Sequence, residues 1–179
     1  MRKFAVIALL FMVAEFAAAQ IPTSGNVFFG YSYYNTNLSG NRKSLNGWEG
    51  SLEGKFLPFI GIVADFDGHY GSEDFRACNG FDCVLFSADV THHDYLFGPR
   101  ASFSVGRFRP FGELLIGASH VNAHHATSDT SFATAVGGGL DYKLLKVLAW
   151  RFQGDYVHSN LFNQPENNLR LSTGIVLRF

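Results

Sequence analysis

The feature that most constrains the fold of this chain is an alternation of apolar and polar residues, with a period of two, that recurs along most of its length. It is clearest at the C-terminus, where one set of alternate residues comprises Leu169, Leu171, Thr173, Ile175, Leu177 and Phe179. The intervening set comprises Arg170, Ser172, Gly174, Val176 and Arg178. Successive strand residues point to opposite faces, so two arginines opposite an apolar face are typical of a barrel wall with lipid outside and a polar interior.

Seven further segments, each about ten residues long as in membrane barrels, repeat this alternation. They are residues 26–35, 45–56, 59–70, 92–105, 111–120, 131–142 and 148–158. We therefore predict an all-β fold, an eight-stranded antiparallel up-and-down transmembrane β-barrel. The predicted connections alternate between short ones at residues 57–58, 106–110 and 143–147 and longer, polar ones at residues 36–46, 71–91, 121–130 and 159–168. Short turns at one end and long loops at the other are typical of bacterial outer-membrane barrels.

The composition agrees with a single barrel domain and excludes several other classes of protein. The chain has 179 residues, of which 16% are charged and 16% aromatic, and it contains 19 glycines. This composition excludes a disordered tail, a coiled coil and a charged helical bundle. The formal net charge of −1 lacks the basic excess on which nucleic-acid binding depends.

The N-terminal residues have the three parts of a secretory signal peptide. Arg2 and Lys3 provide a positive start, residues 4–14 are apolar, and three consecutive alanines precede Gln20. The apolar run is too short for a membrane-spanning helix, which needs about 20 residues. We therefore predict that the chain is exported and cleaved before Gln20.

Export also bears on the two cysteines of the chain. Cleavage at the predicted site makes residues 1–19 the signal peptide and residues 20–179 the barrel domain. In an oxidising compartment Cys78 and Cys83 are expected to form a disulfide that closes a loop tip, because two cysteines are too few for a structural zinc site.

The chain resembles the family of small eight-stranded outer-membrane β-barrels, which includes the membrane domain of outer membrane protein A and the opacity-like surface proteins. The segments that carry the resemblance are FFGYSYYN at 28–35, GIVADFDGHYG at 61–71, LFGPRASFSVGRFRPFGELLIG at 96–117 and LSTGIVLRF at 171–179. The resemblance implies residence in the bacterial outer membrane, surrounded by its lipid, and insertion by the barrel-assembly machinery that reads the terminal Phe179. Unlike the two-domain members, the chain is expected to carry no peptidoglycan-binding domain. The family is functionally mixed, so the resemblance implies no activity.

The parity of the strands assigns most of their charged residues to the barrel interior. The assigned residues are Glu49, Glu53, Asp65, Asp67, Arg100, Glu113, Asp141, Arg151, Asp155, Arg170 and Arg178, with Lys55 and Asp94 on the same face. Eight strands leave a lumen just wide enough for side chains to fill, and buried charges must be paired. We therefore expect a network of ion pairs that plugs the lumen. A narrow ion path and catalysis by these carboxylates are the alternatives.

The seven histidines are all expected at the loop end of the barrel. His69 and His92 are predicted to face inward on neighbouring strands, near Asp67 and Asp94. Imidazole with carboxylate is a ligand set for zinc, copper or nickel, which makes His69 and His92 weak metal candidates. Loops also tolerate histidine without any such role, and no cofactor is expected.

Three other functions fit the sequence less well. Residues 156–168 resemble the His/Ser region of outer-membrane lipid A deacylases, but His158 and Ser159 are adjacent, and adjacent strand residues point to opposite faces. A porin-like channel needs more than eight strands, and a secreted lipocalin-like barrel needs its apolar residues inside. The sequence favours a monomeric barrel with a structural or surface-interaction role, no catalysis and an extracellular ligand at its loops. A small lipid-modifying enzyme and a narrow channel stay open as alternatives.

Overall fold

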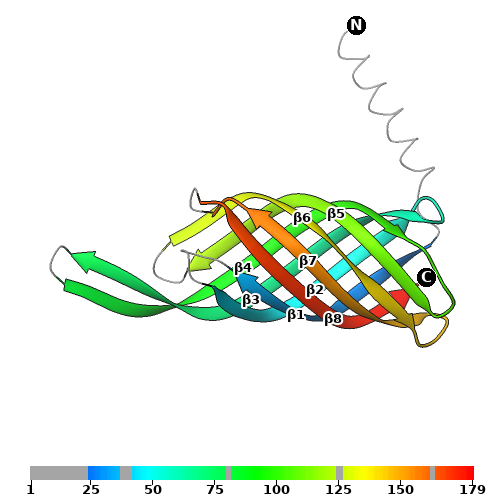
Figure 1. Ribbon diagram of the computed structural model, residues 1–179, viewed down its shortest axis with the longest axis horizontal. Helices are drawn as coiled ribbons and strands as arrows, with labels where there is room; N and C mark the ends of the chain where they lie inside the picture. Colours follow the sequence, from blue (N-terminus) through cyan, green and yellow to red (C-terminus); the bar gives the residue numbers. More distant parts are fainter. Residues whose placement is uncertain (1–23, 37–41, 80–81, 124–126, 162–163) are drawn as a thin grey trace, which may run out of the picture.

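The computed structural model is a closed barrel in which each strand pairs with the next and β1 pairs with β8, so the predicted fold class is confirmed (Figure 1). The strands are β1 (Gly25–Thr36), β2 (Lys43–Lys55), β3 (Ile60–Asn79), β4 (Asp82–Ser102), β5 (Phe108–Ala123), β6 (Thr127–Lys143), β7 (Leu148–Ser159) and β8 (Glu166–Arg178). The structure describes residues 24–36, 42–79, 82–123, 127–161 and 164–179, with backbone only at 73–88, 123 and 127. Among these residues, no helix is both long and apolar enough to span a bilayer.

Where side chains are described, their burial follows the predicted parity along each strand. In β1, Phe29 and Tyr31 are exposed on the outer wall, whereas Phe28 and Ser32 are buried in the lumen. The outer wall thus carries large apolar side chains over its whole circumference, which suits a lipid environment. Closure pairs the backbone of every strand with two neighbours, as is necessary where no water is present.

The prediction of a long loop at residues 71–91 was wrong, because β3 and β4 continue through this segment. Their ladder runs from Ile60↔Ala101 to Asn79↔Asp82. The segment contains apolar and β-branched residues, which favour strands. The result is a hairpin that projects well beyond the rest of the barrel (green in Figure 1).

The turn between β4 and β5 is also tighter than predicted. Val105 and Phe108 exchange backbone hydrogen bonds of 2.8 and 3.0 Å around Gly106 and Arg107. Gly106 has φ 61°, which favours glycine over other residues. β4 ends at Ser102 instead of residue 105, and β5 begins at Phe108, three residues before the predicted start.

The signal peptide and its cleavage before Gln20 lie outside the described residues and stay predictions. The backbone register places Cys78 directly opposite Cys83 in the β3–β4 ladder. Their side chains are not described, so the disulfide also stays a prediction.

We expect Leu114→Arg to destabilise the barrel by about 2–4 kcal/mol, because a cation midway along the lipid-facing wall is costly. Leu114 is 60% exposed on the outside of β5. The matched control is Asn122→Arg, on the same face of the same strand but at its loop end, where an effect below about 1 kcal/mol is expected. Urea unfolding of both variants in phospholipid vesicles measures the difference, and equal effects would contradict the assignment of the outer wall to lipid.

Candidate functional site

The charged interior is the most distinctive feature of the barrel. Ten of the predicted interior residues are at most 4% exposed: Glu49, Glu53, Asp65, Asp67, Arg100, Glu113, Asp141, Arg151, Asp155 and Arg170. The eleventh, Arg178, is partly buried at the rim of the lumen, with its Nη2 3.3 Å from Asp141 Oδ2. The structure therefore brings this predicted set together inside one closed lumen.

A first group of ion pairs lies in the half of the lumen nearer the short turns. Arg100 Nε donates to Glu113 Oε2 at 2.6 Å, and Arg100 Nη1 lies 3.4 Å from Glu53 Oε2. Arg109 Nη2 donates to Glu53 Oε1 at 2.8 Å and to Ser102 Oγ at 2.7 Å. Glu53 is thereby shared between two guanidinium groups from different strands.

Arg151 makes a second ion pair in the same half of the lumen. Its Nε donates to Asp141 Oδ1 at 2.7 Å. The guanidinium carbons of Arg151 and Arg100 lie 4.5 and 4.4 Å from the centroid of the Phe111 ring. Both distances are within the range of cation–π attraction. Phe111 thus shields two like charges inside the lumen.

Arg170 is the centre of the other half of the network. Its Nη1 donates to Asp65 Oδ1 at 2.7 Å and also to Asp67 Oδ2, and its Nη2 donates to Asp155 Oδ2 at 2.9 Å. Its Nε lies 3.5 Å from Glu49 Oε2. One guanidinium therefore holds four carboxylates from strands β2, β3 and β7, and this pairing crosses the whole lumen.

Two further residues join these groups and make room for them. Gln153 Nε2 lies 2.9 Å from Glu49 Oε1 and 3.0 Å from Glu113 Oε1, which connects the two halves. At Gly137, an added Cβ would lie only 1.9 Å from Asp155 Oδ1. Glycine at this position of β6 is therefore needed for the carboxylate of Asp155 to reach Arg170.

The two predicted metal candidates, His69 and His92, lie opposite each other in the β3–β4 ladder, and both side chains are fully buried. His92 Nε2 is 3.0 Å from Asp94 Oδ1 and 2.8 Å from Ser119 Oγ. His69 Nε2 is 2.8 Å from Ser32 Oγ. In the part of the chain that the structure describes, no group of three or more His, Cys, Asp or Glu side chains is placed to hold a metal ion.

Ser32, His69 and Asp67 are arranged in the order of a hydrolytic Ser-His-Asp triad, since His69 Nδ1 lies 3.3 Å from Asp67 Oδ1. Such a triad needs a nucleophile that substrate can reach. Ser32 and His69 are both 0% exposed, so no lipid or solute contacts the hydroxyl. The arrangement is a structural hydrogen-bond network inside the lumen.

His158 and Ser159, the pair considered in the sequence, lie on opposite sides of the barrel wall. His158 is exposed and its Nδ1 is 2.8 Å from Asn167 Oδ1 outside the barrel. Ser159 is 1% exposed and faces the lumen. The imidazole cannot take a proton from this hydroxyl, which is the main objection to a deacylase.

Sequence reasoning missed two residues of the interior. Arg109 was assigned to a turn, although it shares the parity of Glu113 and pairs with Glu53. Tyr34 is fully buried between the two histidines, with ring centroids 4.7 Å from His69 and 4.6 Å from His92. If the alternation had been extended from Glu113 to Arg109 and from Ser32 to Tyr34, it would have assigned both residues to the interior.

The fold and this interior define a class, the small transmembrane β-barrels with a filled lumen. Neisserial surface protein A has a similar structure, with a TM-score of 0.65 and 13% identity over 87% of this chain and 97% of that one. Ail, the attachment invasion locus protein of Yersinia pestis, solved in complex with the heparin analogue sucrose octasulfate, has a TM-score of 0.60 and 17% identity over 87% and 98% of the two chains. No known family model matches the chain. No curated protein matches it either.

The similar structures are outer-membrane barrels, and the chain has their fold: the recognised resemblance is confirmed. The predicted location in the bacterial outer membrane agrees with this fold and with the apolar outer wall. At these sequence identities, what the other barrels bind does not transfer to this chain.

We expect Arg170→Met to lower the free energy of unfolding by about 3–5 kcal/mol, because the substitution leaves buried carboxylates without their cation. The measurement is urea unfolding of the refolded barrel in vesicles. Arg42→Met is the matched control, an exposed arginine at the loop end whose loss should change stability by less than about 0.5 kcal/mol. Replacing Asp65 and Asp155 by asparagine in the Arg170→Met chain should recover part of the loss. Unchanged stability of Arg170→Met would contradict the central position of this residue.

Proposed function

We propose that the protein is a non-catalytic outer-membrane barrel that interacts with an extracellular partner through its projecting β3–β4 hairpin. Residues 1–19 would direct export, and the assembly machinery would insert the mature barrel through recognition of Phe179. The single observation that carries the proposal is the hairpin, because it extends past the strands on both sides of it.

The ladders of the neighbouring strands end where the hairpin begins to project. β2 pairs with β3 only as far as Asn46↔Tyr70, and β5 pairs with β4 only as far as Val90↔Ala123. Beyond these points, the described parts of β3 and β4 pair only with each other. Strand edges with free backbone groups accept a further strand from a partner, which is a common mode of recognition.

The interior supports the absence of catalysis. Ser32 and Ser119 contact His69 and His92 but are 0% exposed, and Ser159 is separated from His158 by the barrel wall. A lipid-modifying enzyme needs a nucleophile and a base on one accessible surface. Neither arrangement meets this condition.

The projecting part of the hairpin can be removed without changing the pairing of the rest of β3 with β4. Gly71 lies opposite Val90, so replacing residues 72–89 with Asn-Gly leaves a two-residue turn at that level. We expect the shortened chain to insert into vesicles and to keep its heat-dependent gel mobility. We also expect cells that display it to lose at least tenfold in adhesion to the matrix protein or glycan that the complete barrel binds.

The probe for this test is a panel of immobilised extracellular-matrix proteins and heparin. The matched control is a chain with residues 124–126 replaced by Gly-Ser-Gly, which changes another connection at the same end of the barrel. Equal adhesion of the shortened chain would exclude the hairpin as the binding surface. Absence of adhesion by the complete barrel would favour a purely structural role.

A narrow channel is the second candidate, and the packed lumen argues against it. Eight strands leave no spare width, and the contacts of Arg109 with Glu53, Gln153 with Glu49 and Arg170 with Asp65 cross the lumen between strands that are not neighbours. We expect the wild-type barrel to show no stable conductance in a planar bilayer, and Arg100→Ala or Arg151→Ala to raise it. Large, reproducible conductance from the wild-type monomer would favour a channel over a non-conducting, surface-binding barrel.

A further inference from the structure

The two ends of the barrel differ sharply in surface chemistry. The end with the short turns, here called the turn end, displays Leu57, Phe59, Val105, Leu144, Leu145 and Val147, which are 47–63% exposed. At the opposite end the described exposed residues next to the barrel are mostly polar, such as Ser44, Asn122 and Asn167. Connections that face water are ordinarily polar, so the turn end needs an explanation.

The apolar side chains of the turn end are held by ordered backbone. Leu57 N donates to Ile60 O at 3.1 Å, and Leu145 N donates to Leu148 O at 2.9 Å in an equivalent turn. Val105 N donates to Phe108 O at 2.8 Å in the third turn. Each turn therefore presents its apolar residues at a defined level.

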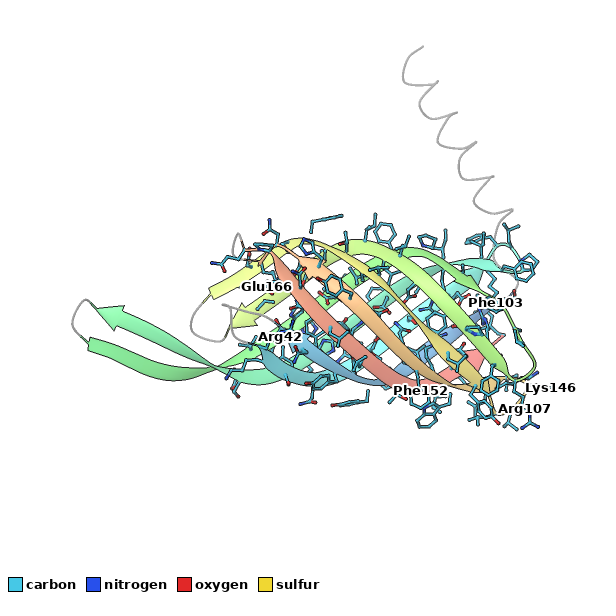
Figure 2. The ribbon with its side chains drawn as sticks, in the orientation of Figure 1. Arg42, Phe103, Arg107, Lys146, Phe152 and Glu166 are labelled. Carbon is cyan, nitrogen blue, oxygen red and sulfur yellow. The ribbon has the colours of Figure 1, made fainter. Side chains whose placement is uncertain are left out.

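The charged side chains of the three turns all have the same sign. Residues 56–59, 103–108 and 143–148 contain no aspartate or glutamate. They contain three bases, Arg107, Lys143 and Lys146, and all three are exposed. Figure 2 shows Arg107, Lys146 and Phe103 at this end of the barrel and Arg42 and Glu166 at the other.

The apolar residues also surround the barrel instead of forming a patch on one side, whereas the three bases lie at the β4–β5 and β6–β7 turns. The three turns connect β2 to β3, β4 to β5 and β6 to β7, and Phe179, which is 63% exposed, lies at the remaining junction of β8 with β1. A rim of this kind is continuous with the lipid-facing wall. It fits a planar surface better than it fits a single globular partner. Two copies placed turn end to turn end would bring like charges together.

We propose that the turn end lies within the interfacial layer of the facing membrane leaflet, where it binds anionic phospholipid. The apolar turn residues contact the glycerol and upper acyl region. Arg107 and Lys146 extend their aliphatic stems through that region and place their charges at the lipid phosphates. The phosphate is that of a lipid headgroup, because the apolar residues beside each base require lipid as well.

The depth of the turn end is tested with a nitroxide at Leu145→Cys in the full mature chain carrying Cys78→Ser and Cys83→Ser. The vesicles contain phosphatidylcholine and phosphatidylglycerol at 7:3, on the order of the anionic content of a natural membrane. We expect collisions with oxygen to exceed those with a water-soluble nickel chelate. A label at Asn167→Cys, exposed at the loop end, is the control and should show the reverse. A Leu145 label as accessible to nickel as the Asn167 label would overturn the proposal. So would a label that is protected only in native membranes, since the occupant would then be a protein.

Headgroup recognition is tested by thermal unfolding in the same vesicles and in pure phosphatidylcholine. We expect the anionic lipid to slow unfolding of the wild-type barrel severalfold, and Arg107→Gln/Lys146→Gln to lose this effect. The matched control Arg107→Lys/Lys146→Arg keeps both charges and should keep the effect. An equal response of all three chains to the anionic lipid would show that these bases bind no headgroup.

Discussion

The pairing of β1 with β8 is the interaction on which the rest of the structure depends. It runs from Asn26↔Arg178 to Asn35↔Leu169 and turns a sheet with two edges into a barrel with none. In lipid, an open edge would leave a row of backbone groups without partners, each costing several kcal/mol. Closure at eight strands also sets the width of the lumen, which leaves space for side chains and little else.

The interior chemistry follows from that width. Charged side chains that enter a narrow, closed lumen lose water and must find partners across it. The half nearer the turns meets this requirement with several arginines that share Glu53, Glu113 and Asp141. The other half meets it with Arg170 alone, which reaches three strands other than its own. The network therefore links distant strands in addition to neutralising charge, and it fills the lumen through which a channel would conduct.

The two ends of the barrel present different surfaces. At one end β3 and β4 extend beyond their neighbours, and their exposed edges suit a partner outside the membrane. At the other, short hydrogen-bonded turns display apolar and basic residues that suit a lipid surface. Both features are consequences of a rigid wall, because a closed barrel holds its connections at fixed levels relative to the bilayer.

The sequence by itself determined the fold class, the number and order of the strands and the face on which most charged strand residues lie. A period of two is a local property, so Glu49 or Arg170 could be assigned to the lumen without knowledge of any neighbour. The extent of the β3–β4 hairpin and the inward position of Arg109 were missed, because polar residues near a turn fit a loop and a strand end equally well. Only the tertiary structure decided which charges pair. Arg170 meets Asp65 across more than a hundred residues of chain, and that contact depends on strand register and barrel closure, which no local pattern encodes.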